Sequence, residues 1–248
     1  MGLAADLARA VDPVALAARI GMDPDDWQAK PLRSRAGRVL LNCSRQSGKS
    51  TVASVLADHE ALYVPGSLTL LLSPSLRQSQ ELFRLCLRTY RNLGRPVSPE
   101  AENQLSLALD NGSRIVSLPG QENTIRGYAG VDLLIIDEAA RVPDETYFAV
   151  RPMLAVSGGR IVAMSTPYGK RGWWFEAWRS DEAWERYEVP AVEVPRISPD
   201  FLHEERRTLG EWFFRQEYEC VFLDPETAAF RTDDIEAMFS EEVEPWAL

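Results

Sequence analysis

The chain carries, near its N-terminal end, the stretch Arg38-Val39-Leu40-Leu41-Asn42-Cys43-Ser44-Arg45-Gln46-Ser47-Gly48-Lys49-Ser50-Thr51. This stretch combines a short apolar strand, a turn of small polar residues and Gly-Lys-Ser at a helix start. Backbone N–H groups at a helix start have no partner within the helix and carry partial positive charge, so they attract anions. The layout is typical of a phosphate-binding loop, in which Lys49 would contact the β- and γ-phosphates and Ser50 would be a Mg²⁺ ligand.

The loop departs from the general phosphate-loop pattern at one position. Cys43 stands where the pattern G-x-x-x-x-G-K-[ST] begins with glycine. The Gly-Lys-Ser core is short enough to recur by chance, and a plain helix start with a solvated lysine is the alternative. The phosphate interpretation therefore needs a second motif elsewhere in the chain.

That second motif is Val131-Asp132-Leu133-Leu134-Ile135-Ile136-Asp137-Glu138. Four consecutive apolar residues indicate a strand that is buried on both faces, as in a parallel sheet. Open α/β sheets bind ligands at the carboxyl ends of their strands, which is where Asp137 and Glu138 fall. Asp137 would hold Mg²⁺ through water, and Glu138 would polarise the attacking water. A strand that ends in a solvated Asp-Glu turn is the alternative.

Two further polar groups accompany these motifs. Ser165 and Thr166 end another apolar run and could sense the γ-phosphate, or simply form a turn. Trp27 and Gln28 precede the loop by about twenty residues. A Gln amide can read both the ring nitrogen and the exocyclic amine of adenine, whereas the simpler interpretation is a surface loop with a buried tryptophan.

Composition limits the class of protein. The 248 residues suit one domain with a small appendage, and the net charge of −10 argues against a nonspecific nucleic-acid coat. The charge is uneven, because residues 224–248 hold eight acids and one arginine and so carry −7 of the total. Five arginines follow one predicted helix, either as a solvated face or as a phosphate-tracking patch: Arg77, Arg84, Arg88, Arg91 and Arg95.

Cysteine, histidine and hydropathy exclude several other classes. Cys43, Cys86 and Cys220 are scattered without metal-ligand spacing, which favours free thiols in a reducing compartment. Two separate histidines are too few for a zinc site. No apolar run approaches membrane length, and no secretory signal opens the chain.

The hydrophobic pattern predicts alternating strands and helices. Asn111-Gly112 between two alternating runs is a strong hairpin signal. We expect strands or extended runs at 39–42, 67–72, 105–109, 114–118, 131–136, 160–164, 185–194 and 219–223. We expect helices within 1–25, with a start at Asp12-Pro13, and at 49–62, 76–93, 144–154, 172–178, 198–209 and 211–218.

Taken together, these motifs resemble one known family, the large terminase subunit of tailed bacteriophages, which is the ATP-driven motor of viral DNA packaging. The similar features span nearly the whole chain in the family's order: Trp27-Gln28, Ser44-Arg45-Gln46-Ser47-Gly48-Lys49-Ser50, Ile125-Arg126-Gly127, Leu134-Ile135-Ile136-Asp137-Glu138-Ala139, Ser165-Thr166-Pro167 and Phe214-Arg215-Gln216-Glu217-Tyr218-Glu219-Cys220. An arginine within a phosphate loop that lacks its first glycine is itself typical of that family.

The resemblance implies an α/β P-loop NTPase fold with a mostly parallel central sheet flanked by helices, of the additional-strand ATPase type, plus a small lid subdomain. The expected organisation is an N-terminal helical segment (1–24), the ATPase core (25–189), the lid (190–223) and an acidic linker (224–248). Family members also carry a C-terminal nuclease domain. The acids at 233–244 are too crowded to form one, so we expect no DNA cleavage by this chain.

The resemblance also implies the ligands and the site. ATP and Mg²⁺ are the expected cofactors, with Ser44, Arg45, Gln46, Ser47, Gly48, Lys49, Ser50 and Thr51 around the phosphates, Trp27 and Gln28 at the adenine, and Ser50 and Asp137 at the metal. Glu138 and Lys49 are the expected catalytic groups. Arg126 would reach into the neighbouring subunit's site, with Arg45 as the competing arginine within the subunit. Ser165 and Thr166 would couple hydrolysis to DNA movement.

The implied partners are double-stranded DNA, the portal protein, the small terminase subunit and further copies in a ring, usually of five, that assembles from a monomer. The expected location is the cytoplasm of the infected bacterial host, with no membrane. Two other functions share these motifs. One is a superfamily-2-like helicase or translocase, which would need a second ATPase-like lobe. The other is a nucleotide-gated structural module without turnover.

Overall fold

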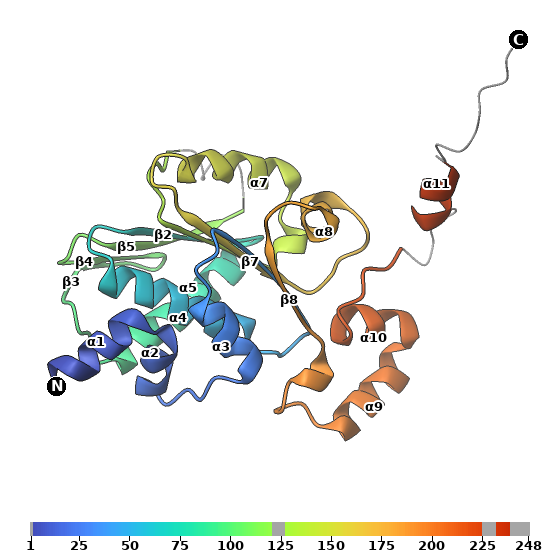
Figure 1. Cartoon of the computed structure of the whole chain (residues 1–248), viewed down its shortest axis with the longest axis horizontal. Coiled ribbons are helices and arrows are strands. Elements are labelled where there is room, and N and C mark those ends of the chain that lie inside the picture. The colour runs from blue at the N-terminus through green and yellow to red at the C-terminus, as the bar shows by residue number, and fades with distance from the viewer. Residues whose placement is uncertain (1, 121–126, 225–231, 239–248) are drawn as a thin grey trace, which may run out of the picture.

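The computed structural model describes residues 2–120, 127–224 and 232–238, which form one sheet covered by helices on both faces (Figure 1). The strand order is β3-β4-β5-β2-β6-β7-β1-β8. The strands are β1 (Arg38–Cys43), β2 (Leu68–Ser73), β3 (Pro99–Glu102), β4 (Ser106–Leu109), β5 (Arg114–Pro119), β6 (Leu133–Asp137), β7 (Arg160–Ser165) and β8 (Glu185–Val189). The β3–β4 and β4–β5 pairs are antiparallel and the other neighbours are parallel, which confirms the expected mostly parallel α/β sheet.

One strand separates the two motifs. Strand β7 lies between β1, which leads into the phosphate loop, and β6, which ends in the acidic pair. This is the additional strand that the family resemblance implied. The register aligns Asn42 with Ser165, and Asp137 with Met164. The three segments that follow these strands therefore leave the sheet at the same edge.

Helices cover the sheet in two layers. Helices α1 to α5 lie on one face and α7 and α8 on the other (Figure 1). They are α1 (Leu3–Val11), α2 (Pro13–Arg19), α3 (Asp26–Arg33), α4 (Lys49–Tyr63), α5 (Leu76–Asn92), α7 (Asp144–Val150) and α8 (Gly172–Arg179), joined by the 3-10 turns η1 (Ala139–Arg141) and η2 (Arg151–Leu154). All five residues of β6 are buried between the layers, as a continuous apolar run in a parallel sheet requires.

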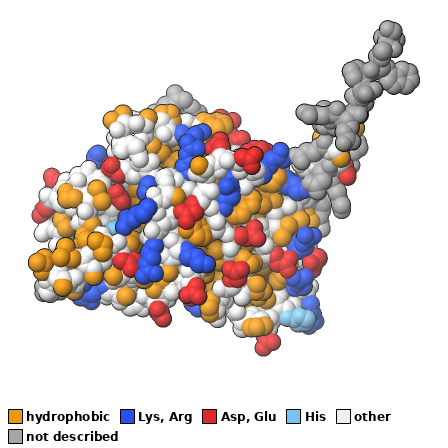
Figure 2. Space-filling view, viewed as in Figure 1, with side chains coloured by type: hydrophobic (Ala, Val, Ile, Leu, Met, Phe, Trp, Pro, Cys, Tyr) orange, Lys and Arg blue, Asp and Glu red, His pale blue; other side chains and the backbone are white. Residues whose placement is uncertain are grey.

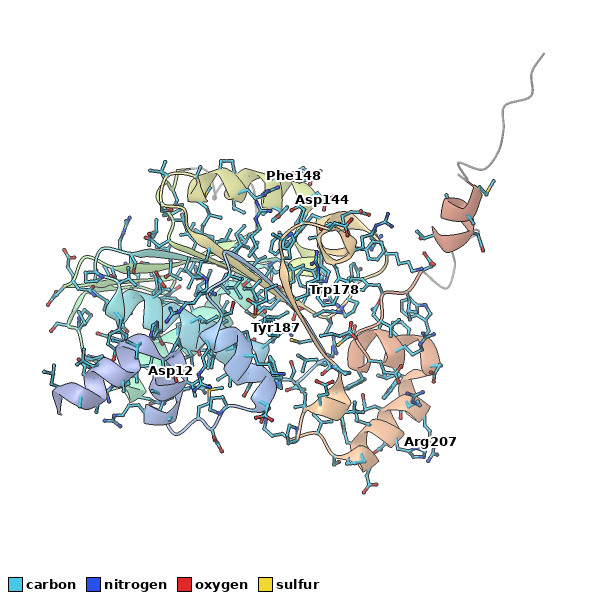
Figure 3. All side chains as sticks on the ribbon, viewed as in Figure 1. Asp12, Asp144, Phe148, Trp178, Tyr187 and Arg207 are labelled. Carbon is cyan, nitrogen blue, oxygen red and sulfur yellow. The ribbon has the colours of Figure 1, made fainter. Side chains whose placement is uncertain are left out.

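The α7–α8 layer is held by aromatic packing. Tyr147 of α7 stacks on Trp173 of α8 with ring centroids 3.9 Å apart and planes 7° apart. The Asp144 carboxylate accepts a hydrogen bond of 2.8 Å from the Trp173 amide. Figure 3 shows Phe148 and Asp144 of α7 near the top of the molecule and Trp178 of α8 below them.

A pair of helices follows the sheet. Strand β8 leads through η3 (Ala191–Glu193) to α9 (Pro199–Leu209) and α10 (Glu211–Tyr218), which we call the lid helices; α11 (Thr232–Met238) follows further along. The lid helices have their own small core of Ala191, Leu202, Phe214 and Tyr218. They lie beside the end of β8, at the side of the sheet where the phosphate loop begins (Figure 1).

Among the predicted elements, one strand and one helix differ from the structure. The strand expected at 219–223 is wrong, because Cys220 takes a left-handed φ of 61° and the Val221 amide bonds back to Arg215 at the end of α10. The helix expected at 144–154 ends at Val150 and continues as a 3-10 turn, since Pro152 has no N–H with which to continue the α-helical hydrogen bonds.

The other differences concern an edge strand and two motif residues. Strand β3 (Pro99–Glu102) was not predicted, because it lies at the sheet edge and has no alternating apolar pattern. Trp27 and Gln28 lie on helix α3 and not in the surface loop of the simpler interpretation. Residues 121–126, and with them Arg126, lie outside the described residues.

The expectation for the cysteines agrees with the structure. The three thiols are free and buried, as expected from their spacing. Within the described ranges, no helix has the length and the apolar character needed to cross a membrane.

We predict that buried Asp58 limits stability at neutral pH. Its side chain is 1% exposed between the helices of the α1–α5 layer, and Oδ2 has no hydrogen-bond partner among the described residues. Burial raises its pKa well above the ordinary value. The folded state therefore binds the proton more tightly than the unfolded state and loses stability as the pH rises.

The test is Asp58→Asn, measured by urea unfolding at several pH values. The variant should gain stability over the wild type by up to about 1.4 kcal/mol per pH unit above the unfolded-state pKa of about 3.9, until the folded-state pKa is reached. Asp23→Asn, on an exposed loop residue, is the control. A stability difference that does not change with pH would contradict the prediction.

Candidate nucleotide-binding and catalytic site

The phosphate loop folds as a tight turn between β1 and α4. Gly48 precedes the helix with a left-handed φ of 96°, a conformation that glycine adopts without strain. Ser44 and Ser47 are buried, and their hydroxyls have no hydrogen-bond partner within the described part of the chain. The loop thus presents the free amides at the start of a 15-residue helix together with unsatisfied hydroxyls, which suits a phosphate group.

Contacts from distant segments fix this loop. The Ser44 amide donates to the Val189 carbonyl, and the Arg45 amide donates to the Glu217 carbonyl of α10, both at 2.9 Å. Arg196 donates to the Ser47 carbonyl at 2.7 Å and pairs with Asp25 at 2.6 Å. The loop is therefore held from β8, from the lid helices and from the start of α3.

Gln28 lies directly against the loop. Its side chain is 2% exposed, and its Oε1 accepts a hydrogen bond of 3.0 Å from the Asp25 amide in a capping box at the start of α3. Its Nε2 faces Gly48, since a Cβ added to that glycine would lie 2.8 Å away. A two-point contact from Gln28 to adenine stays a prediction. Trp27 is buried on the same turn.

The acidic pair lies opposite the loop. The Lys49 Nζ and the Glu138 Oε1 are 2.9 Å apart, so the two motifs meet across β7. Burial opposes the charge on Lys49, but Glu138 and Asp137 outweigh burial and raise its pKa. Ser50, Asp137 and Glu138 share one cavity of about 590 Å³ with side chains of α5. This volume is in the range of small-molecule sites.

Asp137 has the properties of a metal ligand. It is buried, and its Oδ1 has no hydrogen-bond partner in the described residues. Burial raises the pKa of Asp137 to about 6, against the opposing charge of Lys49. A buried carboxylate oxygen without a partner is costly, and a carboxylate beside a serine hydroxyl is the hard oxygen set that Mg²⁺ prefers. Asp137 and Ser50 therefore fit a magnesium ion.

Glu138 is held on both of its oxygens. Its Oε1 pairs with Lys49, and its Oε2 accepts a hydrogen bond of 2.9 Å from Arg141. Burial by itself would raise its pKa, but Lys49 and Arg141 lower it, so the group is an ionised carboxylate. Glu138 has a left-handed φ of 50°. Residues other than glycine seldom adopt this conformation, and those that do are concentrated at functional sites.

Ser165 and Thr166 connect to the segment after the acidic pair. The Ser165 hydroxyl accepts a hydrogen bond of 3.2 Å from the Ala140 amide, and the Thr166 hydroxyl accepts one of 3.3 Å from Arg141. Both side chains are buried. A backbone movement after Glu138 would therefore shift these two hydrogen bonds and act on the end of β7.

The structure brings together most of the predicted site. The phosphate loop, Asp137, Glu138, Ser165 and Thr166 lie at one edge of the sheet. Arg45 instead turns toward the lid, where its Nε lies 2.7 Å from Glu217. Three participating side chains were not given a role from the sequence: Arg141, Glu217 and Arg196. Arg141 could have been noticed because it follows Glu138 by three residues, whereas nothing local to Arg196 indicates its contact with the loop.

This fold and site define the class as a P-loop nucleotide-binding fold with an additional strand between its two motifs. The sequence matches the family described as "Terminase large subunit, T4likevirus-type, N-terminal" over residues 40–237. The chain belongs to this family.

Known proteins with similar sequences are also terminases. The large terminase subunit of Thermus virus P23-45 is 29% identical over 256 residues, covering 85% of this chain and 51% of that protein. The large terminase subunit of Escherichia phage T5 is 28% identical over 208 residues, covering 79% of this chain and 46% of that protein. The chain thus spans about half the length of the curated relatives it matches.

Solved structures agree with the fold. The large terminase ATPase domain of Thermus phage P74-26 superposes with a TM-score of 0.76 at 25% identity, covering 84% of this chain and 97% of that one. The large terminase of bacteriophage HK97 superposes with a TM-score of 0.66 at 14% identity, covering 81% of this chain and 51% of that one.

We predict that the loop cannot accept a side chain at Gly48. A Cβ there would lie 2.8 Å from Gln28 Nε2 and 3.2 Å from Arg196 Nη2, in addition to the left-handed φ. Gly48→Ala should therefore weaken nucleotide binding by at least tenfold and lower the free energy of unfolding by about 1–3 kcal/mol. Fluorescent-nucleotide titration and urea unfolding measure the two effects.

Gly66→Ala is the matched control for this experiment. Gly66 also has a positive φ of 78°, but a Cβ there meets nothing within 4 Å. It should share the backbone strain and leave nucleotide binding unchanged. Equal nucleotide affinity in the two alanine variants would show that the Gly48 contacts do not shape the loop.

Proposed function

We propose that this chain is the ATPase motor part of a phage large terminase, which hydrolyses ATP to move double-stranded viral DNA into a procapsid. One observation carries the proposal: Ser50, Asp137 and Glu138 line a single cavity at the carboxyl edge of the sheet, and Lys49 pairs with Glu138 there. The family of the chain supports the same reading, because the relatives are named as large terminase subunits.

The residues of the site would divide the reaction between them. The amides at the start of α4 and the Lys49 ammonium would bind the β- and γ-phosphates. At Lys49 the phosphates would replace Glu138. Ser50 and Asp137 would hold Mg²⁺, which neutralises charge on the phosphates when bound. Glu138, released from Lys49, would orient a water molecule for in-line attack on the γ-phosphorus and accept its proton. The products are ADP and phosphate.

An arginine from a neighbouring subunit completes the proposed site. Arg126 is our candidate, and such a residue contributes roughly 10³–10⁵ to the rate in related enzymes. Arg45 is the weaker candidate, because Glu217 already engages its side chain. We propose a ring of subunits, usually five, at the portal, with the small terminase subunit as a further partner and the cytoplasm of the infected host as the location.

Helix α5 is our proposed contact with DNA. Arg77, Arg84 and Arg88 are exposed and line the cavity that also contains Asp137 and Glu138. Residues three, four or seven apart share one helix face, so the three arginines lie along one face of α5, with Glu81 among them and paired with Arg84 at 2.7 Å. On the face shown in Figure 2, basic and acidic side chains are interspersed.

We predict that Glu138→Gln binds ATP and fails to hydrolyse it. Glutamine cannot accept the proton and no longer competes with phosphate for Lys49, so nucleotide binding should be equal or tighter while turnover falls by about 10²–10⁴-fold. Phosphate release and nucleotide titration measure the two quantities, with DNA and portal present. Turnover should also be lost in EDTA, as Mg²⁺ dependence requires.

Glu145→Gln, on an exposed position of α7, is the control and should keep wild-type turnover. Wild-type turnover in Glu138→Gln would contradict the role of the carboxylate. If the unmodified chain binds ATP but never hydrolyses it, even with DNA and portal, the nucleotide-gated module is the better description.

We predict that the double substitution Arg84→Ala and Arg88→Ala weakens binding to double-stranded DNA. Each lost phosphate contact should reduce the slope of log K against log salt by about 0.9, so the slope should fall by about 2. Arg207→Ala is the control, because Arg207 is exposed on the lid helices, at the lower right of Figure 3. An unchanged salt slope in the double variant would remove α5 from the DNA path.

A further inference from the structure

Arg141 is the side chain through which the acidic pair reaches the lid helices. Its Nη1 donates to Glu138 Oε2 at 2.9 Å and to the Thr166 hydroxyl at 3.3 Å. Its Nη2 lies 3.7 Å from Oε1 of Glu217 on α10. One guanidinium thus faces the carboxylate of the proposed catalytic site, the end of β7 and the lid at the same time.

The guanidinium is fixed in this place by its surroundings. It lies over the ring of Tyr168 at 4.8 Å, as expected for a cation–π contact. The short 3-10 turn η1 begins directly after Glu138 and brings Arg141 back toward that residue. A planar fork with several donors can engage two carboxylates at once, which a lysine ammonium does less well.

Glu217 links this arginine to the phosphate loop. Its side chain is 8% exposed, its Oε2 lies 2.7 Å from Arg45 Nε, and its carbonyl accepts the Arg45 amide. The charged side chains therefore alternate without a gap in the order Lys49, Glu138, Arg141, Glu217 and Arg45. Both ends of the chain of charges lie in the phosphate loop, and Glu217 belongs to the lid.

The two arms of Arg141 differ in strength. The contact with Glu138 is a hydrogen bond, whereas 3.7 Å to Glu217 is within ion-pair range but too long for a hydrogen bond. A lid movement of roughly 1 Å would turn the second arm into a hydrogen bond or open it, since hydrogen bonds of this kind end near 3.2 Å. A movement of the lid helices would therefore change the contacts of the Arg141 guanidinium, which also holds Glu138.

We infer that Arg141 is a positioning residue, which holds Glu138 in place once phosphate occupies Lys49 and makes that placement depend on the lid through Glu217. A phosphate bound at Lys49 would compete with Glu138 for the ammonium and so weaken one of the two restraints on Glu138. Arg141 supplies the restraint that is left. This inference rests on the proposed ATPase function, because it assigns a role within that reaction.

The first test compares Arg141→Ala and Arg141→Lys with the wild type. The alanine variant should lower kcat by about 10–100-fold, as expected when a catalytic group is misplaced by about 1 Å, while nucleotide affinity changes by less than about threefold. Lysine can hold one carboxylate, so Arg141→Lys should recover part of kcat. Arg151→Ala is the matched control, because that arginine also lies over a tyrosine ring, at 5.5 Å, but belongs to η2.

The second test uses Glu217→Gln, which keeps the backbone contact to Arg45 and removes the charge that faces both Arg141 and Arg45. It should lower kcat at constant nucleotide affinity, and its effect should be less than additive with that of Arg141→Ala, because both act through one contact. If the alanine variant fails to fold, Glu217→Gln and Arg141→Lys carry the test. Additive effects, or a wild-type kcat in Arg141→Ala or in Glu217→Gln, would overturn the inference.

Failure of the inference can be told from failure of the proposed function. If Glu138→Gln abolishes turnover and Arg141→Ala does not alter it, only the positioning role is wrong. If Glu138→Gln itself retains wild-type turnover, the assignment of the catalytic carboxylate is wrong, and the role of Arg141 falls with it.

Discussion

The ion pair between Lys49 and Glu138 is the contact on which the arrangement of this site depends. The two residues end different strands, and β7 separates those strands. Because neighbouring strands lie about 4.8 Å apart, β1 and β6 are roughly 10 Å apart, which leaves room for a phosphate group and a metal between their ends. Without ligand, the ammonium and the carboxylate satisfy each other. Phosphate binding would replace this pair and release the carboxylate for chemistry.

The surroundings of the pair explain why it is stable and yet replaceable. Both side chains are largely buried, so neither charge could stay there without a partner. Arg141 gives Glu138 a second partner, and Asp137 gives Lys49 a second negative neighbour. Each charge therefore keeps an opposite charge nearby before and after phosphate replaces Glu138 at Lys49. Repeated cycles of nucleotide binding and release require this.

The contacts that join the lid helices to the phosphate loop are polar. The core of the lid helices is small, Ile197 packs against both it and the main core, and the link to the loop runs through Glu217 and Arg45. Polar contacts of this kind depend strongly on distance, so modest movements of the lid can change them without disrupting the sheet. The large apolar clusters lie on the two faces of the sheet and keep the strand ends in register.

The sequence by itself determined the sheet elements and the two motifs, because apolar runs, an Asn-Gly turn and Gly-Lys-Ser are local signals. It also indicated that Lys49 and Asp137 would share an edge, since parallel strands end together. Only the tertiary structure decided that Gln28 would support the loop, that β3 would add an edge strand and that residues 219–223 would not form one. It alone placed Arg141 against Glu217 and Arg196 against Ser47. Arg196 and Ser47 are 149 positions apart in the chain. The partners in such contacts are set by packing and strand order, which no local pattern encodes.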